Sequence, residues 1–210
     1  MQTLELEQGR REWVEARRNY VGASEAPAVR EVSKYEPKNP IQLARKKLGF
    51  SKPDFVNNAM KEGHRLEPII RQQVVDFLQM KFTPKVVAEG KMLASLDGIN
   101  ESGDVILEIK APATTKDTVK LAMDGRVALP YQYQIQHQLM VSGADKCIYA
   151  VRNPEDHQVY YFDVFPDQLM QKKLAQAWAD FEPLMNLNED ELKTSEPLPA
   201  DLAPMIDDFI

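Results

Sequence analysis

The sequence has a single cysteine, Cys147, and it has no long apolar run. One cysteine excludes a disulfide framework within the chain, and it excludes a zinc or iron–sulfur site built from cysteines. No apolar stretch approaches the ~20 residues that a membrane-spanning helix needs. The first residues also lack the basic and then apolar layout of a secretory signal. We therefore expect a reducing, cytoplasmic environment.

Basic residues are scarce at the end of the chain. Of 32 acidic and 26 basic residues, seven acidic residues but only Lys193 follow Asn186, which leaves 25 of each sign in residues 1–185. The formal net charge of −6 therefore belongs to the last segment. A balanced body can hold a basic groove opposite an acidic surface, so the sequence pI of about 5.2 does not exclude a nucleic-acid partner.

The remaining composition is that of a globular chain. Its 210 residues are 43% hydrophobic and 28% charged, which suffices for one domain with a real core. Internal repeats are absent from the sequence. We predict a single domain over residues 1–186, followed by an acidic tail over residues 187–210 that contains Pro197, Pro199 and Pro204. That tail is either flexible or docked on a partner.

Helical periodicity dominates the first 80 residues, where helices are predicted over residues 10–18, 25–30, 40–48 and 60–80. Ser24 is the predicted N-cap of the second helix, and Asn39-Pro40 marks the start of the third. Strands are predicted over residues 92–97, 104–110, 146–152 and 159–165. Later helices run from Pro130 to Gly143 and from Asp167 onward, the last with a predicted buried stripe of Leu169, Leu174, Trp178 and Phe181. This order predicts an α/β or α+β fold with a central mixed sheet flanked by helices.

The strands on either side of residues 98–103 form a predicted β-hairpin that gathers charged residues. Side chains two apart in a strand share a face, so Glu108 and Lys110 project together while the alternate apolar residues pack on the other side. The hairpin returns Asp97 beside them. Two carboxylates suit Mg²⁺, and Lys110 can orient or deprotonate a water and offset charge on a pentacovalent phosphorus. The alternative is an ordinary surface ion pair.

A carboxylate on the preceding long helix is a candidate third ligand. Glu67 follows Gly63 by one helical turn and could reach a metal at the hairpin, or it could pair with Arg71 at i,i+4. His64 lies three residues before Glu67, so it could share that face either as a polar or stacking residue or as a ligand.

Two further clusters are candidates for contacts to a phosphate strand. Tyr131, Gln134 and Gln138 share one face of a helix, which fits either contacts to sugar-phosphate and bases or a polar helix surface. Arg17 precedes Ser24 by seven residues. A hydroxyl at a helix N-terminus beside a guanidinium is an anion site, although an ordinary N-cap with a solvated arginine is the alternative.

Taken in order, these segments resemble the lambda-exonuclease type of alkaline nuclease, the YqaJ-like viral recombinases of the PD-(D/E)xK superfamily, and in particular a prophage-encoded member. The resemblance covers roughly residues 10–185. Its motifs are Arg17…Val21-Gly22-Ala23-Ser24-Glu25, Asn39-Pro40 with Lys47-Leu48-Gly49, Gly63-x-x-x-Glu67-Pro68, Ser95-x-Asp97…Glu108-Ile109-Lys110 and Tyr131-x-x-Gln134-x-Gln136. It implies a restriction-endonuclease-like core. Leu96 stands where the superfamily motif has a proline, which the family tolerates.

The resemblance implies roles for the acidic and basic residues of the hairpin. Asp97 and Glu108 would hold two Mg²⁺ ions, with Mn²⁺ as an alternative, helped by the backbone carbonyl of Ile109. Glu67 would assist metal binding or position the water, and Lys110 would activate it. The implied activity is a 5′-to-3′ exonuclease that releases 5′ mononucleotides from double-stranded DNA and leaves 3′ single-stranded overhangs for annealing-type recombination.

The resemblance also implies a substrate pocket and partners. A 5′-terminal phosphate would bind a pocket formed by Arg17, Ser24, Ser95 and Gln134, with Tyr131 beside it. The family implies a homotrimeric ring that threads duplex DNA and a single-strand annealing protein, which the tail over residues 187–210 could contact.

Other functions compatible with the same residues are a structure- or sequence-specific endonuclease of the superfamily and a DNA-end-binding module that does not cut. The superfamily's iron–sulfur nucleases are excluded, because their cluster needs four cysteines and this sequence has one.

Overall fold

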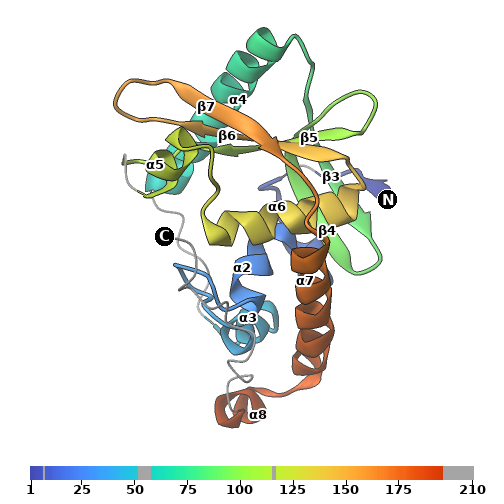
Figure 1. The fold of residues 1–210 in the computed structure, drawn as a ribbon. Helices are drawn as coiled ribbons and strands as arrows, with labels where there is room; N and C mark the ends of the chain where they lie inside the picture. The colour runs from blue at the N-terminus through green and yellow to red at the C-terminus, as the bar shows by residue number, and fades with distance from the viewer. Residues whose placement is uncertain (7, 52–57, 115–116, 196–210) are drawn as a thin grey trace.

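The computed structural model describes residues 1–6, 8–51, 58–114 and 117–195, which build one mixed β-sheet (Figure 1). Its strands are β1 (Gln2–Leu4), β2 (Val21–Gly22), β3 (Thr83–Glu89), β4 (Met92–Ile99), β5 (Val105–Lys110), β6 (Lys146–Arg152) and β7 (Val159–Val164). Their order is β1, β3, β4, β5, β6, β7, and β2 pairs with β4. The β5–β6 and β2–β4 pairs are parallel and the other pairs are antiparallel, so the predicted central mixed sheet is confirmed.

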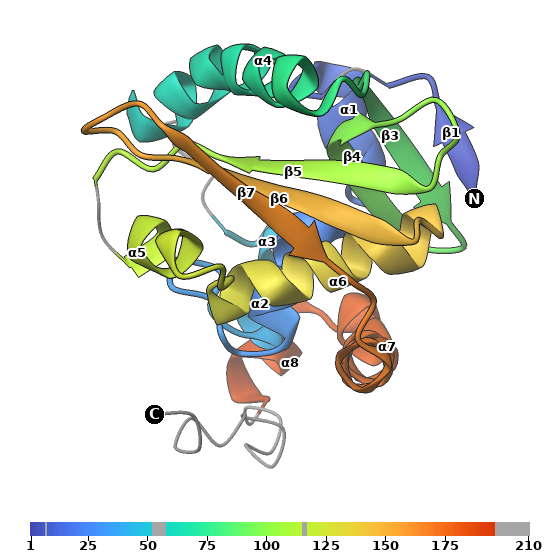
Figure 2. The same cartoon turned by 45° about the horizontal axis from the view of Figure 1, so that its top comes forward.

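Helices cover both faces of this sheet. They are α1 (Arg11–Ala16), α2 (Ala26–Val29), α3 (Pro40–Lys47), α4 (Asn58–Leu78), α5 (Asp117–Met123), α6 (Leu129–Ser142), α7 (Gln168–Phe181) and α8 (Glu189–Thr194), with 3₁₀ turns η1 (Ala23–Glu25) and η2 (Glu182–Asn186). Figure 2 shows α4 on one face and α6 on the other, with α2, α3, α7 and α8 beyond α6. Parallel strands require a crossover, and α5 and α6 provide it between β5 and β6.

Alternate residues of β5 serve two separate cores. Ile106 packs on the α6 side with Ile135, whereas Leu107 and Ile109 pack on the α4 side with Ile70. The predicted alternation along this strand is therefore confirmed. Because both faces of β5 are covered by helices, its charged residues near the C-terminal end are drawn into the protein rather than left on a surface.

A third core lies between α6 and the outer helices. Leu174, Trp178 and Phe181 of α7 are buried there as predicted, and the Trp178 Nε1 donates a hydrogen bond to Nδ1 of the buried His137 at 3.1 Å. The prediction for Leu169 is wrong, since this residue is 63% exposed. The buried stripe instead begins at Met170, which lies one turn before Leu174 and packs against this core, so Leu169 falls beside the stripe.

The predicted helix boundaries hold where a cap specifies them. Asn39 accepts a hydrogen bond from the backbone N–H of Gln42 at 2.9 Å, and Asp167 accepts one from Met170 at 2.9 Å. Gly143 ends α6 with a φ of 67°, in the left-handed region that favours glycine. Ser24 is not an N-cap, because it lies inside η1 and Gly22 precedes that turn.

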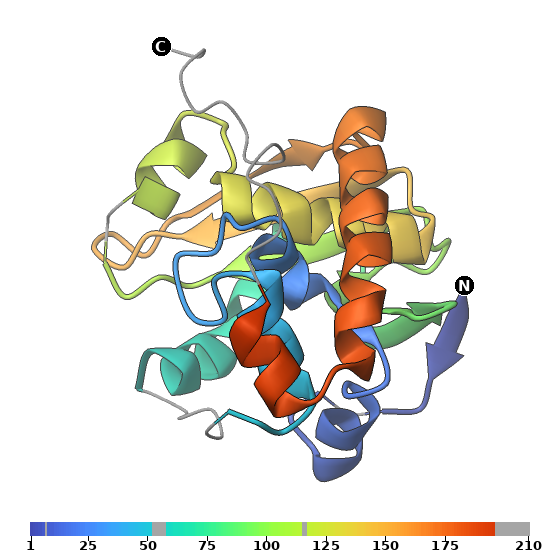
Figure 3. The same cartoon turned by 90° about the horizontal axis from the view of Figure 1, so that it is seen from below.

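The region after Asn186 differs from the prediction of an aperiodic tail. Residues 189–194 form α8, whose Leu192 is 1% exposed and packs in the third core. Figure 3 shows α8, at the red end of the colour range, beside α3. The rest of the predicted tail, residues 196–210, lies outside the described residues. Among the helices of the described ranges, none is long and apolar enough to cross a membrane.

Candidate active site

The centre of the site is the point where β4 and β5 separate. Their paired residues are Gly98 with Leu107 and Ile99 with Ile106. One residue beyond this short ladder, the Asp97 Oδ2 accepts a hydrogen bond from the backbone N–H of Ile109 at 2.7 Å. The aspartate side chain thus takes the place of a strand partner. Gly98 is required here, because a Cβ at this position would lie 2.7 Å from the Cβ of Phe82.

Glu108 is the most enclosed acid of the site, with its side chain only 2% exposed. Its Oε1 lies 2.5 Å from the Lys110 Nζ and accepts a hydrogen bond from the Gln134 Nε2 at 2.8 Å. Its Oε2 accepts one from the Gln138 Nε2 at 2.6 Å. The Lys110 Nζ also donates to the Gln134 Oε1 at 3.1 Å and lies 4.5 Å from the centre of the Tyr131 ring. The alternative of an ordinary surface ion pair is therefore wrong, because Glu108 is buried and the Lys110 side chain is only 20% exposed.

Glu67 makes the predicted i,i+4 ion pair with Arg71, and the same arginine ties it to the hairpin. The Arg71 Nε donates a hydrogen bond to the backbone carbonyl of Asp97 at 2.6 Å. Glu67 and His64 both line the cavity that contains Asp97. Pairing with Arg71 and proximity to the hairpin are therefore compatible in this structure.

The acids are held at an electrostatic cost that a cation would relieve. Burial raises the pKa of Asp97 well above its usual range, and the neighbouring charges of Glu108 and Glu67 raise it further. Burial likewise raises the pKa of Glu67. Burial alone would lower the pKa of Lys110, but the combined attractions of Glu108, Tyr131 and Asp97 outweigh it and raise that pKa, so Lys110 is an ammonium.

The donor set fits a hard divalent cation. No three histidine, cysteine, aspartate or glutamate side chains of the described ranges are already gathered as a metal site. Mg²⁺ needs only one or two carboxylates because it keeps several waters, and Asp97 and Glu108 supply two. Arg71 contacts Glu67 through Oε1, which leaves Oε2 as the oxygen for a third ligand contact. The contribution of the Ile109 carbonyl stays a prediction.

The ten residues to which the resemblance assigns site roles all line one cavity of about 780 Å³. These are Arg17, Ser24, Glu67, Ser95, Asp97, Glu108, Ile109, Lys110, Tyr131 and Gln134. They come from the C-cap of α1 and from η1, α4, β4, β5 and α6, so only the tertiary fold brings them together. The cavity also has the exposed Tyr35 in its lining.

The part of the cavity lined by Arg17, Ser24 and Ser95, which we call the anion end, holds groups that can donate hydrogen bonds to an anion. The Arg17 Nη2 donates a hydrogen bond to the Ser24 Oγ at 3.0 Å, and its guanidinium carbon lies 4.6 Å from the centre of the Trp13 ring. The Trp13 Nε1 donates to the Ser95 Oγ at 2.8 Å. Because Ser24 does not begin a helix, the attraction for an anion comes from the guanidinium and the two hydroxyls. A solvated Arg17 is excluded by these contacts.

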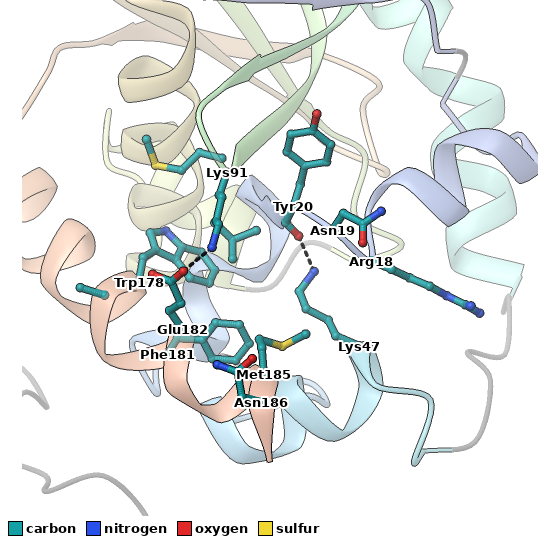
Figure 4. A pocket seen from close by; sticks show the side chains of 13 residues that line it. Arg18, Asn19, Tyr20, Lys47, Lys91, Trp178, Phe181, Glu182, Met185 and Asn186 are labelled. Carbon is teal, nitrogen blue, oxygen red and sulfur yellow. Dashed lines mark hydrogen bonds and ion pairs between the residues drawn. The ribbon is translucent and has the colours of Figure 1, made fainter. Parts of the chain in front are cut away.

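Lys47 contacts the segment that carries Arg17 and the side chain of Glu25, and the sequence patterns gave this lysine no role. Its Nζ lies 2.8 Å from the Glu25 Oε2 and donates to the backbone carbonyls of Arg17 at 2.9 Å and Tyr20 at 2.7 Å. Glu25 in turn lies 3.2 Å from the Arg17 Nη2. Figure 4 shows Lys47 reaching Tyr20 across a second cavity of about 360 Å³, which contains none of the ten predicted residues.

The glutamine-rich helix α6 is buried rather than a polar surface. Gln138 is fully enclosed, so it binds Glu108 and is unable to contact a nucleic-acid strand as the sequence suggested. Gln136 is also buried and bonds to the backbone of Phe165 and Asp167. The alternation of glutamines therefore reflects two sets of internal hydrogen bonds, one on each side of the helix.

The geometry agrees with a match to a known family. Residues 12–145 match the family model described as the YqaJ-like viral recombinase domain. The chain belongs to the YqaJ-like viral recombinase family. The match includes Arg17, Ser24, the hairpin acids and the α6 glutamines within its bounds. No curated protein sequence gives a significant match to the chain.

Solved structures share the fold of this family member. An alkaline exonuclease from Laribacter hongkongensis, LHK-Exo, has a TM-score of 0.70 at 22% identity, covering 88% of this chain and 95% of that one. The same enzyme in complex with dAMP gives a TM-score of 0.72 with the same identity and coverage. A phage-related exonuclease from Haemophilus somnus 129PT gives 0.62 at 11% identity, covering 79% and 93%. Family and fold together support a nuclease.

Proposed function

We propose that this chain is a divalent-metal-dependent exonuclease that degrades one strand of linear double-stranded DNA from its 5′ end. It would release 5′ mononucleotides and leave 3′ single-stranded overhangs for annealing-type recombination in the cytoplasm of a bacterial host. The observation that carries this proposal is the single cavity in which Asp97, Glu108 and Lys110 share space with the arginine and hydroxyls of the anion end. An endonuclease does not need that second feature.

The acids and Lys110 supply the chemistry of phosphodiester hydrolysis. Asp97 and Glu108 would hold the Mg²⁺ ions, two in the full complement, with Glu67 and the Ile109 carbonyl as further ligands. The bound cations supply a more acidic water and stabilise charge that develops on the phosphate. Lys110 would orient the attacking water and, as an ammonium, offset the added negative charge of the transition state.

The anion end of the cavity would set which bond is cut. A 5′-terminal phosphate would accept hydrogen bonds from Arg17, Ser24 and Ser95, with Gln134 and Tyr131 completing the pocket. Holding the terminal phosphate at a fixed place puts the next phosphodiester at the acids. Each cut then falls one nucleotide inward.

The proposal includes partners that follow from the family. A homotrimeric ring around duplex DNA would turn salt-sensitive backbone attraction into processive digestion, because the substrate is unable to leave sideways. A single-strand annealing protein would bind the acidic tail over residues 187–210. Removal of residues 196–210 tests that contact without disturbing Leu192, and unchanged affinity for the annealing protein would contradict it.

The test of the activity compares three DNA substrates in Mg²⁺ or Mn²⁺ and in EDTA. A blunt linear duplex with 5′ phosphates should yield 5′ mononucleotides, the same duplex with 5′ hydroxyls should react more slowly, and a covalently closed circle should stay intact. Lys110→Ala should abolish cleavage and leave DNA binding largely in place. Cutting of the circle would favour an endonuclease, and binding without cleavage in either metal would favour an end-binding module.

A further inference from the structure

The acceptor sites of the Glu108 carboxylate are unequally occupied. Each carboxylate oxygen can accept about two hydrogen bonds or ligand contacts. The Oε1 is already contacted by the Lys110 Nζ and the Gln134 Nε2, at 2.5 and 2.8 Å. The Oε2 has a hydrogen bond from the Gln138 Nε2 alone, at 2.6 Å. The acceptor site that remains for a cation is therefore on Oε2, the oxygen that Gln138 holds.

Gln138 is placed to fix that oxygen rather than to touch a substrate. It is fully buried, and the cavity that contains Glu108 and Gln134 is not lined by it. Its helix is locked on both sides of it, because Ile135 and Leu139 pack in the core beneath the sheet. A buried side chain on a packed helix has little freedom, so its amide can hold the carboxylate in one orientation.

We propose that Gln138 is a positioning residue that orients Glu108 so that its Oε2 presents the remaining lone pair to the divalent cation. The inference rests on the proposed function, since it assigns Glu108 to metal binding. An amide suits this task because it donates a hydrogen bond without bringing a charge. A lysine or arginine in its place would add a second positive charge to that of Lys110 and would repel the cation further.

The alternative is that Gln138 only satisfies a buried carboxylate. In that case its loss would lower stability but would leave the metal dependence of the protein unchanged. The two roles are separated by measuring metal affinity and thermal stability on the same variants, because orientation of a ligand changes the first quantity specifically. Loss of a partner that orients a ligand in this way typically weakens metal binding or activity about 10- to 100-fold.

The experiment replaces the donor and keeps the shape. Gln138→Met removes the hydrogen bond at similar volume, and Gln136→Met is the matched control. Gln136 lies on the same helix and is 2% exposed, but its Nε2 bonds to the Phe165 carbonyl at 2.9 Å instead of an acid. For each protein we would measure Mn²⁺ binding by calorimetry, the Mg²⁺ concentration for half-maximal cleavage, and Tm.

Gln138→Met should raise the dissociation constant for Mn²⁺ and the Mg²⁺ concentration for half-maximal cleavage about 10- to 100-fold, and high Mg²⁺ should partly restore cleavage. Gln136→Met should leave both quantities near the wild-type values. The proposal would be overturned if Gln138→Met kept the wild-type values of these two quantities, or if both variants changed them equally. If Gln138→Met does not fold, Gln138→Leu takes its place. Failure of both to fold while Gln136→Met folds would assign Gln138 a structural role instead.

The calorimetric readout keeps this inference separate from the proposed activity. Wild-type protein that binds Mn²⁺ but cuts no DNA would overturn the exonuclease, while the comparison of Gln138→Met with wild type would still decide the positioning role. Wild-type protein that binds no divalent cation would overturn both.

Discussion

The buried histidine of α6 gives the protein a predictable sensitivity to acid. His137 is fully enclosed, and its Nδ1 accepts a hydrogen bond from Trp178, which places the proton of the neutral ring on Nε2. Burial lowers the pKa of His137 to about 4 from an ordinary value of 6.5, although the charge of Glu25 works in the opposite direction. Between about pH 4 and pH 6.5, His137 is therefore protonated in the unfolded chain but neutral in the folded chain.

The sign and size of the effect follow from linkage. Stability from the neutral ring is fully present above about pH 6.5 and is lost as the pH falls toward 4, because the unfolded state then takes up the extra proton. The difference between 6.5 and about 4 corresponds to about 3 kcal/mol in total, of which about 2 kcal/mol is lost by pH 5. Asp97, whose pKa is raised, increases stability as the pH falls, which opposes the effect of His137. This contribution is the same in the wild type and in a His137 variant.

The assay is urea unfolding followed by far-UV circular dichroism, at about pH 7.5 and about pH 5, for the wild type and His137→Gln. Glutamine keeps an acceptor for Trp178 but does not titrate. Between the two pH values, the wild type should lose about 2 kcal/mol more unfolding free energy than the variant, and shared groups cancel in that difference. Parallel pH dependences that agree within about 0.5 kcal/mol would refute the account of a neutral, desolvated His137.

Three further substitutions, two of them with a control variant, test the fold and the anion end. Lys47→Met should destabilise the protein by about 3 kcal/mol or more in urea, because it breaks a buried ion pair, and should reduce the preference for 5′-phosphorylated over 5′-hydroxyl duplex in kcat/KM. Lys91→Met, at an exposed lysine, should do neither. Leu174→Ala should cost about 2–5 kcal/mol and Leu169→Ala less than about 0.5 kcal/mol, as measured by the same unfolding assay. Gly98→Ala should lower stability by about 1–3 kcal/mol, and a wild-type Tm would contradict the close contact at that residue.

Local patterns predicted how Asp97, Glu108 and Lys110 come together. The two-residue period of β5 places Glu108 and Lys110 on one face, and the turn after β4 returns Asp97 to them. These relations depend on residues close in sequence, so they need no knowledge of the tertiary fold. Gln134 and Gln138 were grouped correctly on one face of α6, but the burial of that helix depends on elements far from it in sequence, among them β4, α2 and α7.

The sequence patterns did not predict contacts between distant segments of the chain. The hydrogen bond from Trp13 to Ser95 joins residues that are 82 positions apart, and Lys47 meets Glu25 only because α3 packs behind η1. No periodicity encodes such pairs. β3 was missed because its first residues are exposed and include Pro84, which weakens a strand signal.

One missed element had a readable signal. Asn188 accepts hydrogen bonds from the backbone of Asp190 and Glu191, and the Glu191 carboxylate accepts one from the backbone of Asn188. This reciprocal capping box corresponds to Asn-x-x-Glu in the sequence and could have predicted α8. The abundance of acidic residues in that segment concealed it.

The position of Trp13 makes it an intrinsic fluorescence probe of the anion end. The chain has two tryptophans, and Trp178 is 7% exposed in the third core, so Trp178→Phe would leave a single indole beside Arg17 and Ser95. Indole emission depends on the charges and hydrogen bonds around the ring. Occupation of the anion end should therefore be visible as a change in intrinsic fluorescence, in real time and without a label on the DNA.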